Sequence, residues 1–281
     1  MNYQPYIDQL ITLAIAEDIG DGDHTSLSCI APDAVGKMKL LVKQEGVIAG
    51  TAIARQIFQR VDAGLQMEQL IDDGTKVAVG DIVFYVSGKV LSLLQAERLV
   101  LNVMQRMSGV ATQTAVYVKQ LEGLKTQVID TRKTTPGMRA LDKLAVSTGG
   151  GGNHRMGLFD MMLLKDNHID FAGGVEQAIR KAQDYLQRTG RKLAIEVEVR
   201  SLDDIHTVMR VGGVQRIMLD NFDIPRTKEA VALINGRYEI ESSGGITLQD
   251  LRAYAECGVD FISVGALTHQ IKSLDLSLKA C

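Results

Sequence analysis

Basic residues closely follow two short apolar runs of the sequence. Arg132 and Lys133 come soon after the apolar pair 128–129, and Lys165 comes directly after the run 161–164. Because ligands bind at the carboxyl ends of strands in parallel sheets and barrels, we expect these three cations to gather at one mouth. The chain has a net charge of -3, so the positive charge is local. It favours an anionic small molecule over a nucleic-acid surface.

A glycine-rich segment adds two groups of the same kind. The glycines 149–152 precede His154 and Arg155. The run is either a flexible linker or a loop that holds both side chains over a ligand. The planar fork of a guanidinium matches a carboxylate, so several arginines and a histidine together predict a substrate with more than one carboxylate.

Two glutamates alternate with apolar residues in the next strand-like run, 194–199. In a barrel the apolar set would meet the outer helices, which leaves Glu196 and Glu198 pointing inward. A buried carboxylate needs a cation or a metal ion. We expect Glu198 to serve a site, with a structural ion pair as the alternative, and we expect Glu196 to form an interior ion pair.

Small residues follow the last two strand-like runs, 238–241 and 261–264. They are Ser243, Gly244, Gly245, Gly265 and Ala266. Glycines let a backbone approach a ligand closely, and helix N-termini offer free N–H groups. Loops after the last two strands are the usual phosphate cradle of such barrels. We therefore favour a phosphate site over simple turns.

The elements that must position these residues alternate along the chain. Strand-like runs cover 128–129, 161–164, 194–199, 216–219, 238–241 and 261–264, and helical patterns cover 138–146, 175–186, 202–211, 226–234 and 248–257. Alternating β and α elements predict a parallel sheet with right-handed crossovers, either doubly wound or a barrel. Because six strands are fewer than eight, we favour an irregular or incomplete (β/α) barrel.

The first part of the chain has a different pattern. Helices are predicted over 6–19 and 51–61, and strands over 36–44, 67–71 and 82–90. We expect an α+β sandwich-like domain over 1–110, a barrel over 111–266, and a tail, 267–281, that packs back on the first domain. The segment 91–121 is predicted as one long helix or two, broken near Gly109. The acidic stretch 17–26 lacks calcium-loop spacing and indicates a capped turn.

Composition limits the class of protein. The chain is 46% hydrophobic and 23% charged, which is typical of a soluble globular protein. It contains neither the roughly 20 apolar residues of a membrane span nor a secretory signal. Cys29, Cys257 and Cys281 are widely spaced and indicate a reducing compartment. We therefore expect a cytoplasmic protein with no membrane or nucleic-acid partner.

Three motifs together resemble a known family. They are Asp130-Thr131-Arg132-Lys133-Thr134-Thr135-Pro136-Gly137, Asn153-His154-Arg155 and Lys165-Asp166-Asn167-His168. The chain closely resembles nicotinate-nucleotide pyrophosphorylase (carboxylating), also called quinolinate phosphoribosyltransferase, over almost its whole length. The resemblance implies an irregular barrel and a Mg²⁺-dependent transferase of NAD biosynthesis. This enzyme would convert quinolinate and phosphoribosyl pyrophosphate to nicotinate mononucleotide, CO₂ and pyrophosphate.

The resemblance also implies roles for individual residues. Quinolinate is expected on Arg98, Thr131, Arg132, His154, Arg155 and Lys165, with Arg98 supplied by the neighbouring subunit of a homodimer or larger homo-oligomer. Phosphoribosyl pyrophosphate is expected on Lys133, Glu198, Asp220, Ser243, Gly244, Gly245, Gly265 and Ala266. Mg²⁺ would bind Glu198 and Asp220. The catalytic set would be Lys133, Lys165, Glu198 and Asp220.

Three other interpretations stay open. Lys165 could form a Schiff base, as in a class I aldolase, which fits the phosphate cradle and leaves the Arg-His cluster unexplained. His154 and His168 could bind a metal ion, although no third His or Cys stands at helpful spacing. A barrel that senses a phosphorylated metabolite without turnover is the non-enzyme hypothesis.

Overall fold

The computed structural model describes residues 2–281, which divide into two compact units. Unit 1 comprises residues 2–116, 133–150 and 266–281. Unit 2 comprises residues 117–132 and 151–265. The chain therefore leaves unit 1 and returns to it twice.

Unit 1 contains an antiparallel sheet of four strands. In spatial order they are β12 (Leu276–Ala280), β1 (Val35–Val42), β5 (Ile82–Lys89) and β3 (Gln66–Gln69). Leu40, Val42 and Val86 are buried on one face, as alternating patterns predict. β12, which lies in the tail, pairs with β1. A short second sheet pairs β2 (Gly46–Val47) with β4 (Lys76–Val77).

Three helices of the first half match the predicted ranges closely: α1 (Gln4–Ile19), α3 (Thr51–Val61) and α4 (Val90–Gln120). A fourth, the short helix α2 (His24–Cys29), was not predicted. The acidic stretch caps α2, where the Asp23 carboxylate accepts the main-chain N–H of Ser26. The predicted capped turn is confirmed.

The helix α4 runs through Gly109 without a break, so the alternative of two helices is wrong. A Cβ at Gly109 would meet the main-chain oxygen of Lys272 and would lie 3.1 Å from Cα of Ser273. The glycine therefore allows the tail to pass close to the helix. Next to this crossing, the Leu274 N–H donates to the Gln105 carbonyl at 2.9 Å.

A buried ion pair links three helices of unit 1. Arg106 on α4 makes a bidentate pair with Asp142 on α5 (Arg139–Thr148), at 2.9 Å for both bonds. The same guanidinium donates to the carbonyl of Thr268 on α11 (Ala266–His269) at 3.2 Å. Arg106 is thus held by partners within unit 1.

Unit 2 contains a parallel sheet of six strands. In spatial order they are β6 (Gln127–Ile129), β11 (Phe261–Ser263), β10 (Glu239–Ser243), β9 (Arg216–Asp220), β8 (Ile195–Val199) and β7 (Met162–Leu164). The sheet does not close, because β6 and β7 form no ladder within residues 2–281. The incomplete (β/α) barrel is confirmed, and all six strand-like runs are strands.

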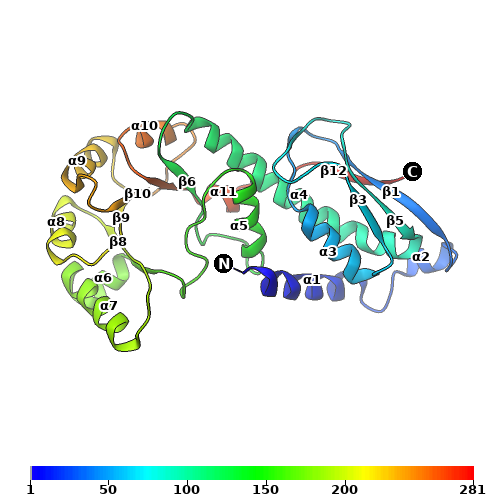
Figure 1. Ribbon diagram of the computed structural model, residues 1–281, viewed down its shortest axis with the longest axis horizontal. Helices are drawn as coiled ribbons and strands as arrows, with labels where there is room; N and C mark the ends of the chain where they lie inside the picture. The colour runs from blue at the N-terminus through cyan, green and yellow to red at the C-terminus, as the bar shows by residue number, and fades with distance from the viewer. Residues whose placement is uncertain (1) are drawn as a thin grey trace. The chain divides into compact units, whose positions relative to one another are not determined.

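Helices cover the outer side of this sheet. They are α6 (Asp166–Ala172), α7 (Val175–Thr189), α8 (Leu202–Val211), α9 (Ile224–Ile234) and α10 (Leu251–Ala255). Figure 1 shows α7, α8 and α9 outside β8, β9 and β10. The short helices α6 and α11 were not predicted. No helix in residues 2–281 combines the length and apolar character of a membrane span.

The Arg106–Asp142 pair yields a stability prediction. The Asp142 side chain is 1% exposed, so burial raises its pKa while Arg106 opposes that shift. Asp142→Ala leaves the Arg106 charge partly buried without its partner, and we expect the free energy of unfolding to fall by about 3–5 kcal/mol. Urea denaturation followed by circular dichroism measures it.

Asp170→Ala is the matched control, because the Asp170–Arg200 pair is half-exposed on both sides. We expect little change in that variant. Equal losses in the two variants would contradict the structural role assigned to the buried pair.

Candidate active site

The carboxyl ends of β7, β8 and β9 bring a cation next to two carboxylates. Lys165 directly follows β7, and its Nζ lies 3.4 Å from Oε2 of Glu198 on β8. Asp220 ends β9, the next strand of the sheet. The Lys165 side chain is 48% exposed and that of Glu198 only 8%. The pair therefore presents an accessible amine that is held by a largely buried carboxylate.

The loop after β10 comes very close to the end of β9. The main-chain N–H of Asn221 donates to the Ser243 carbonyl at 2.9 Å, and Asn221 Nδ2 donates to Asp220 at 2.9 Å. Gly244 has φ +105°, and a Cβ there would lie 2.9 Å from the Asn221 nitrogen. A side chain does not fit, so Gly244 is required for this approach. Gly244 thus lets the loop after β10 pack directly against Asn221 at the end of β9.

The segment after β6 and the glycine-rich segment are tied by one buried aspartate. Asp130, which is 0% exposed, accepts the His154 main-chain N–H and the Asn153 side-chain amide, both at 2.8 Å. The Asp160 carboxylate accepts the main-chain N–H groups of Met156 and Gly157. These bonds fix the backbone of residues 153–157, which follow the glycine run.

His154 points into the unit and contacts two buried carboxylates. Its Nε2 lies 3.0 Å from Oε2 of Glu196 and 3.5 Å from Oε2 of Glu241. Its Nδ1 accepts the main-chain N–H of Arg155 at 2.7 Å. Within residues 2–281 these three side chains form the one group whose ligand atoms lie close enough for a metal ion. His168 is not part of it, since its Nδ1 accepts the Lys165 N–H at the start of α6.

Arg155 and Arg132 place two guanidinium groups in this region. Arg155 is 9% exposed, and its Nη1 donates to the Met161 carbonyl at 3.1 Å. Burial lowers the pKa of Arg155, the charge of Arg132 lowers it further, and Glu196 opposes both effects. Arg132 and the preceding Thr131 are half-buried. The two guanidinium groups thus influence each other electrostatically, and together they suit an anion.

Arg216 and Glu241 belong to the same group of buried charged side chains as Glu196, and neither was predicted to be part of it. Arg216 on β9 lies 3.1 Å from Glu241 and 3.0 Å from Glu239, both on β10. Burial raises the pKa of Glu196 to about 7 and, together with the Glu196 charge, that of Glu241 to about 8. Two acidic residues alternating in the run 238–241 were the available signal, as in the run 194–199.

The remaining expected residues lie in unit 1. Lys133 is exposed, and its carbonyl accepts the Thr268 hydroxyl at 2.9 Å. Arg98 is exposed on α4, and Ala266 begins α11. The unit 2 residues Ser243, Gly244, Gly245 and Gly265 follow β10 and β11 as expected.

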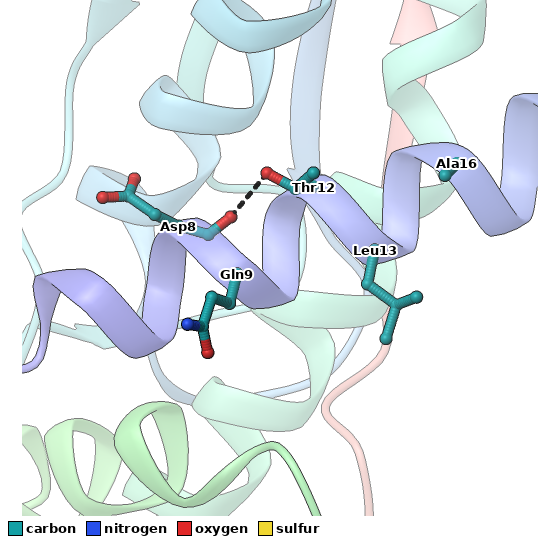
Figure 2. Close-up of a pocket in the computed structure, with 5 residues that line it drawn as sticks. All are labelled: Asp8, Gln9, Thr12, Leu13 and Ala16. Atoms are coloured by element: carbon teal, nitrogen blue, oxygen red, sulfur yellow. Dashed lines mark hydrogen bonds between the residues drawn. The ribbon is translucent and has the colours of Figure 1, made fainter.

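A pocket on unit 1 has the wrong chemistry for an anionic substrate. Figure 2 shows that it is lined by one helix, α1, through Asp8, Gln9, Thr12, Leu13 and Ala16. The Thr12 hydroxyl donates to the Asp8 carbonyl at 2.8 Å. The lining offers a carboxylate and no cation. The strand ends of unit 2 are the better candidate.

Comparison with known families covers nearly the whole chain. The family model described as "Quinolinate phosphoribosyl transferase, N-terminal domain" matches residues 23–108, and the one for the C-terminal domain matches residues 110–279. The chain belongs to the quinolinate phosphoribosyltransferase family. The resemblance on which the sequence interpretation depended is confirmed.

Individual relatives of the family agree. "Quinolinate phosphoribosyltransferase [decarboxylating] 1b" of Nicotiana tabacum is 45% identical, over 96% of this chain and 81% of that protein. "Probable nicotinate-nucleotide pyrophosphorylase [carboxylating]" of Bacillus subtilis (strain 168) is 39% identical, over 97% of this chain and 92% of that protein. The crystal structure of NadC from Streptococcus pyogenes is 37% identical with a TM-score of 0.92, over 100% of this chain and 99% of that one.

The raised pKa values of Glu196 and Glu241 predict that the stability of this member of the quinolinate phosphoribosyltransferase family depends on pH. Carboxyls with a raised folded-state pKa bind more protons when folded than when unfolded, so stability falls as pH rises from about 5 to 8. Glu241→Gln removes one such group. From pH 5 to pH 8, its stability relative to wild type should rise by at least about 1 kcal/mol. Urea unfolding at pH 5, 6, 7 and 8 measures the change.

Glu239→Gln is the control, because the Glu239 side chain is 53% exposed. Its stability should fall with pH along the wild-type slope. A Glu241→Gln slope equal to that of wild type would show that the buried pair does not titrate in this window.

Proposed function

We propose that this chain transfers a phosphoribosyl group from phosphoribosyl pyrophosphate to quinolinate, with decarboxylation. The products are nicotinate mononucleotide, pyrophosphate and CO₂, and the reaction is a step of NAD biosynthesis. The observation that carries the proposal is the Lys165–Glu198 pair at adjacent strand ends in a chain of the quinolinate phosphoribosyltransferase family. The amine suits an anionic substrate, and the carboxylate suits a developing positive charge on a sugar.

Quinolinate is a dicarboxylate, and cations hold it. In unit 2 the proposed binding groups are Thr131, Arg132, His154, Arg155 and Lys165. The guanidinium groups pair with carboxylates in bidentate fashion. Because Arg155 is fixed by its own main-chain and side-chain bonds, little entropy is lost when it engages the substrate.

Phosphoribosyl pyrophosphate occupies the loops after β9, β10 and β11. Its 5-phosphate lies on the backbone of Ser243, Gly244, Gly245, Gly265 and Ala266. The positive φ of Gly244 and Gly245 turns main-chain groups outward without a Cβ to block them. Lys133 holds the pyrophosphate. Glu198 and Asp220 bind the ribose hydroxyls.

Mg²⁺ fits the donor set of this site. Glu198 and Asp220 are carboxylates on adjacent strands, and Mg²⁺ prefers one or two carboxylates together with substrate phosphates and water. When bound, the ion would neutralise charge on the pyrophosphate. Glu198 also keeps Lys165 in place, at 3.4 Å.

The chemistry needs positioning more than proton transfer. The bond from the anomeric carbon to pyrophosphate breaks, and a bond to the quinolinate ring nitrogen forms. Glu198 and Asp220 stabilise the oxocarbenium-like transition state by charge. The cationic ring then accepts the electron pair left when CO₂ departs, and a proton from water completes the product. No dedicated general base is required.

The proposal includes an oligomer, in which Arg98 of one subunit serves the site of its neighbour. Arg98 is exposed on α4, as a residue that reaches a neighbour must be. A cytoplasmic location is also proposed, and the free thiols of Cys29, Cys257 and Cys281 support it. The proposed enzyme has neither a membrane nor a nucleic-acid partner.

Activity with both substrates tests the function. Purified protein with quinolinate, phosphoribosyl pyrophosphate and Mg²⁺ should release CO₂ and form nicotinate mononucleotide. Lys165→Ala and Arg155→Ala should each lower kcat/KM by at least about a hundredfold, and circular dichroism checks that both fold. Lys181→Ala, an exposed lysine on α7, is the control. Binding without turnover would favour the sensing barrel.

Borohydride trapping distinguishes the proposed transferase from the aldolase interpretation, in which Lys165 forms a Schiff base. A Schiff-base lysine depends on desolvation or a second cation to keep its amine neutral, whereas Lys165 is half-exposed beside a carboxylate. We expect no adduct on Lys165 with phosphorylated sugars. An adduct lost in Lys165→Ala would favour the aldolase.

Mixing two inactive variants tests the shared site. Arg98→Ala and Lys165→Ala should each be inactive alone. If subunits exchange in a dimer, half of the dimers are mixed and each has one intact site, so activity should return to about a quarter of wild type. A fully active Arg98→Ala monomer would exclude the shared site.

A further inference from the structure

A buried charge cluster lies beside the proposed site and has no part in the chemistry above. Glu196 on β8 and Glu241 on β10 are both 0% exposed. Arg216 on the intervening strand, β9, contacts Glu241. Burying two carboxylates is costly, and apolar residues of similar size would often be equally stable. The presence of the cluster therefore needs a reason beyond stability.

The cluster determines which ring nitrogen of His154 carries the proton. The Arg155 main-chain N–H donates to His154 Nδ1 at 2.7 Å, so Nδ1 is an acceptor. The proton of the neutral ring is then on Nε2. That atom faces Glu196 at 3.0 Å and Glu241 at 3.5 Å. Nδ1 is hydrogen-bonded, whereas Nε2 lies within contact distance of the two carboxylates without a hydrogen bond to either. Rotation of the ring would break the Nδ1 bond and move Nε2 away from both carboxylates.

His154 therefore connects the sheet, through Glu196 and Glu241, to the backbone of Arg155. The bonds from Asp130 and Asp160 fix the backbone of the loop at residues 154, 156 and 157. The N–H of Arg155 itself is held by the ring. Any rotation of the ring would release that N–H and shift the direction in which the guanidinium leaves the backbone.

The geometry points to Glu196 and Glu241 as positioning residues for quinolinate recognition. They hold the His154 ring, and the ring holds the backbone of Arg155, so that the guanidinium meets a substrate carboxylate at a fixed angle. The inference rests on the proposed function. It gives His154, which is already proposed above as a quinolinate-binding group, the further role of orienting the backbone of Arg155.

Electrostatics supports the same roles. Arg155 lies in a buried setting near the like charge of Arg132, and Glu196 is among the groups that keep it charged. Arg216 in turn offsets the charge of Glu241 at 3.1 Å. A metal ion at the His154 cluster would add two more positive charges next to these arginines and would displace the Nε2 proton. Glu196 and Glu241 therefore act as counter-charges for the nearby arginines and hold the His154 ring in place.

Steady-state kinetics separates this role from a structural one. Glu196→Leu removes the carboxylate nearest to Nε2, and Glu196→Gln keeps a polar group of nearly the same shape there. We expect the leucine variant to raise the KM for quinolinate at least about tenfold and to leave the KM for phosphoribosyl pyrophosphate within about twofold. The glutamine variant should recover most of the loss. Glu239→Gln, which contacts Arg216 but not His154, should resemble wild type.

Nuclear magnetic resonance of the ¹⁵N-histidine-labelled wild-type protein provides a second readout. His154, assigned by its absence in His154→Gln, should carry its proton on Nε2. This readout does not depend on whether the Glu196 variants fold. A proton on Nδ1 alone, or equal changes in both KM values with a folded Glu196→Leu protein, would overturn the inference. A folded wild-type protein that does not convert quinolinate would instead overturn the proposed function.

Discussion

The structure of unit 2 depends on one constraint, the neutralisation of carboxylates buried on a parallel sheet. Glu196 and Glu241 have no access to water, and an unpaired carboxylate there would be prohibitively costly. Arg216 supplies a positive charge from the middle strand, and the neutral His154 ring of the loop contacts both carboxylates through Nε2. The loop is therefore held against the sheet at His154, and it carries Arg155 with it.

Residues two apart on a strand share a face, so on each strand one residue can join the buried charges while the next on the same face lies at the strand end. Glu196 and Glu198 share a face of β8, and the inner residue joins the buried cluster while the outer one meets Lys165. On β10 the same spacing puts Glu241 in the cluster and Ser243 at the strand end. A one-residue shift in register would turn both sets away from the site. The buried charges consequently fix the register that presents the substrate groups.

The local sequence pattern was enough to predict the strands and helices, but it was not enough to predict which side chains of different strands are in contact. The apolar runs and their polar ends located all six strands and the glycine-containing loops after β10 and β11, because hydrophobic periodicity is a local property. Arg216 was missed because its partners lie one strand away, and strand order is not encoded in any single run. Gly109 was misjudged for the same reason: the close approach of Lys272 comes from residues far along the chain.

The same reasoning explains why Lys165 had two interpretations in the sequence and favours one in the structure. A lysine after an apolar run fits either a desolvated amine or an exposed cation, since the run says nothing about its neighbour. Strand order places Glu198 beside it at 3.4 Å and leaves the side chain 48% exposed. An exposed amine beside a carboxylate suits an anionic ligand such as a dicarboxylate or a diphosphate, and it lacks the desolvated surroundings of a nucleophilic lysine. The chemistry of the residue is thus decided by the strand next to it.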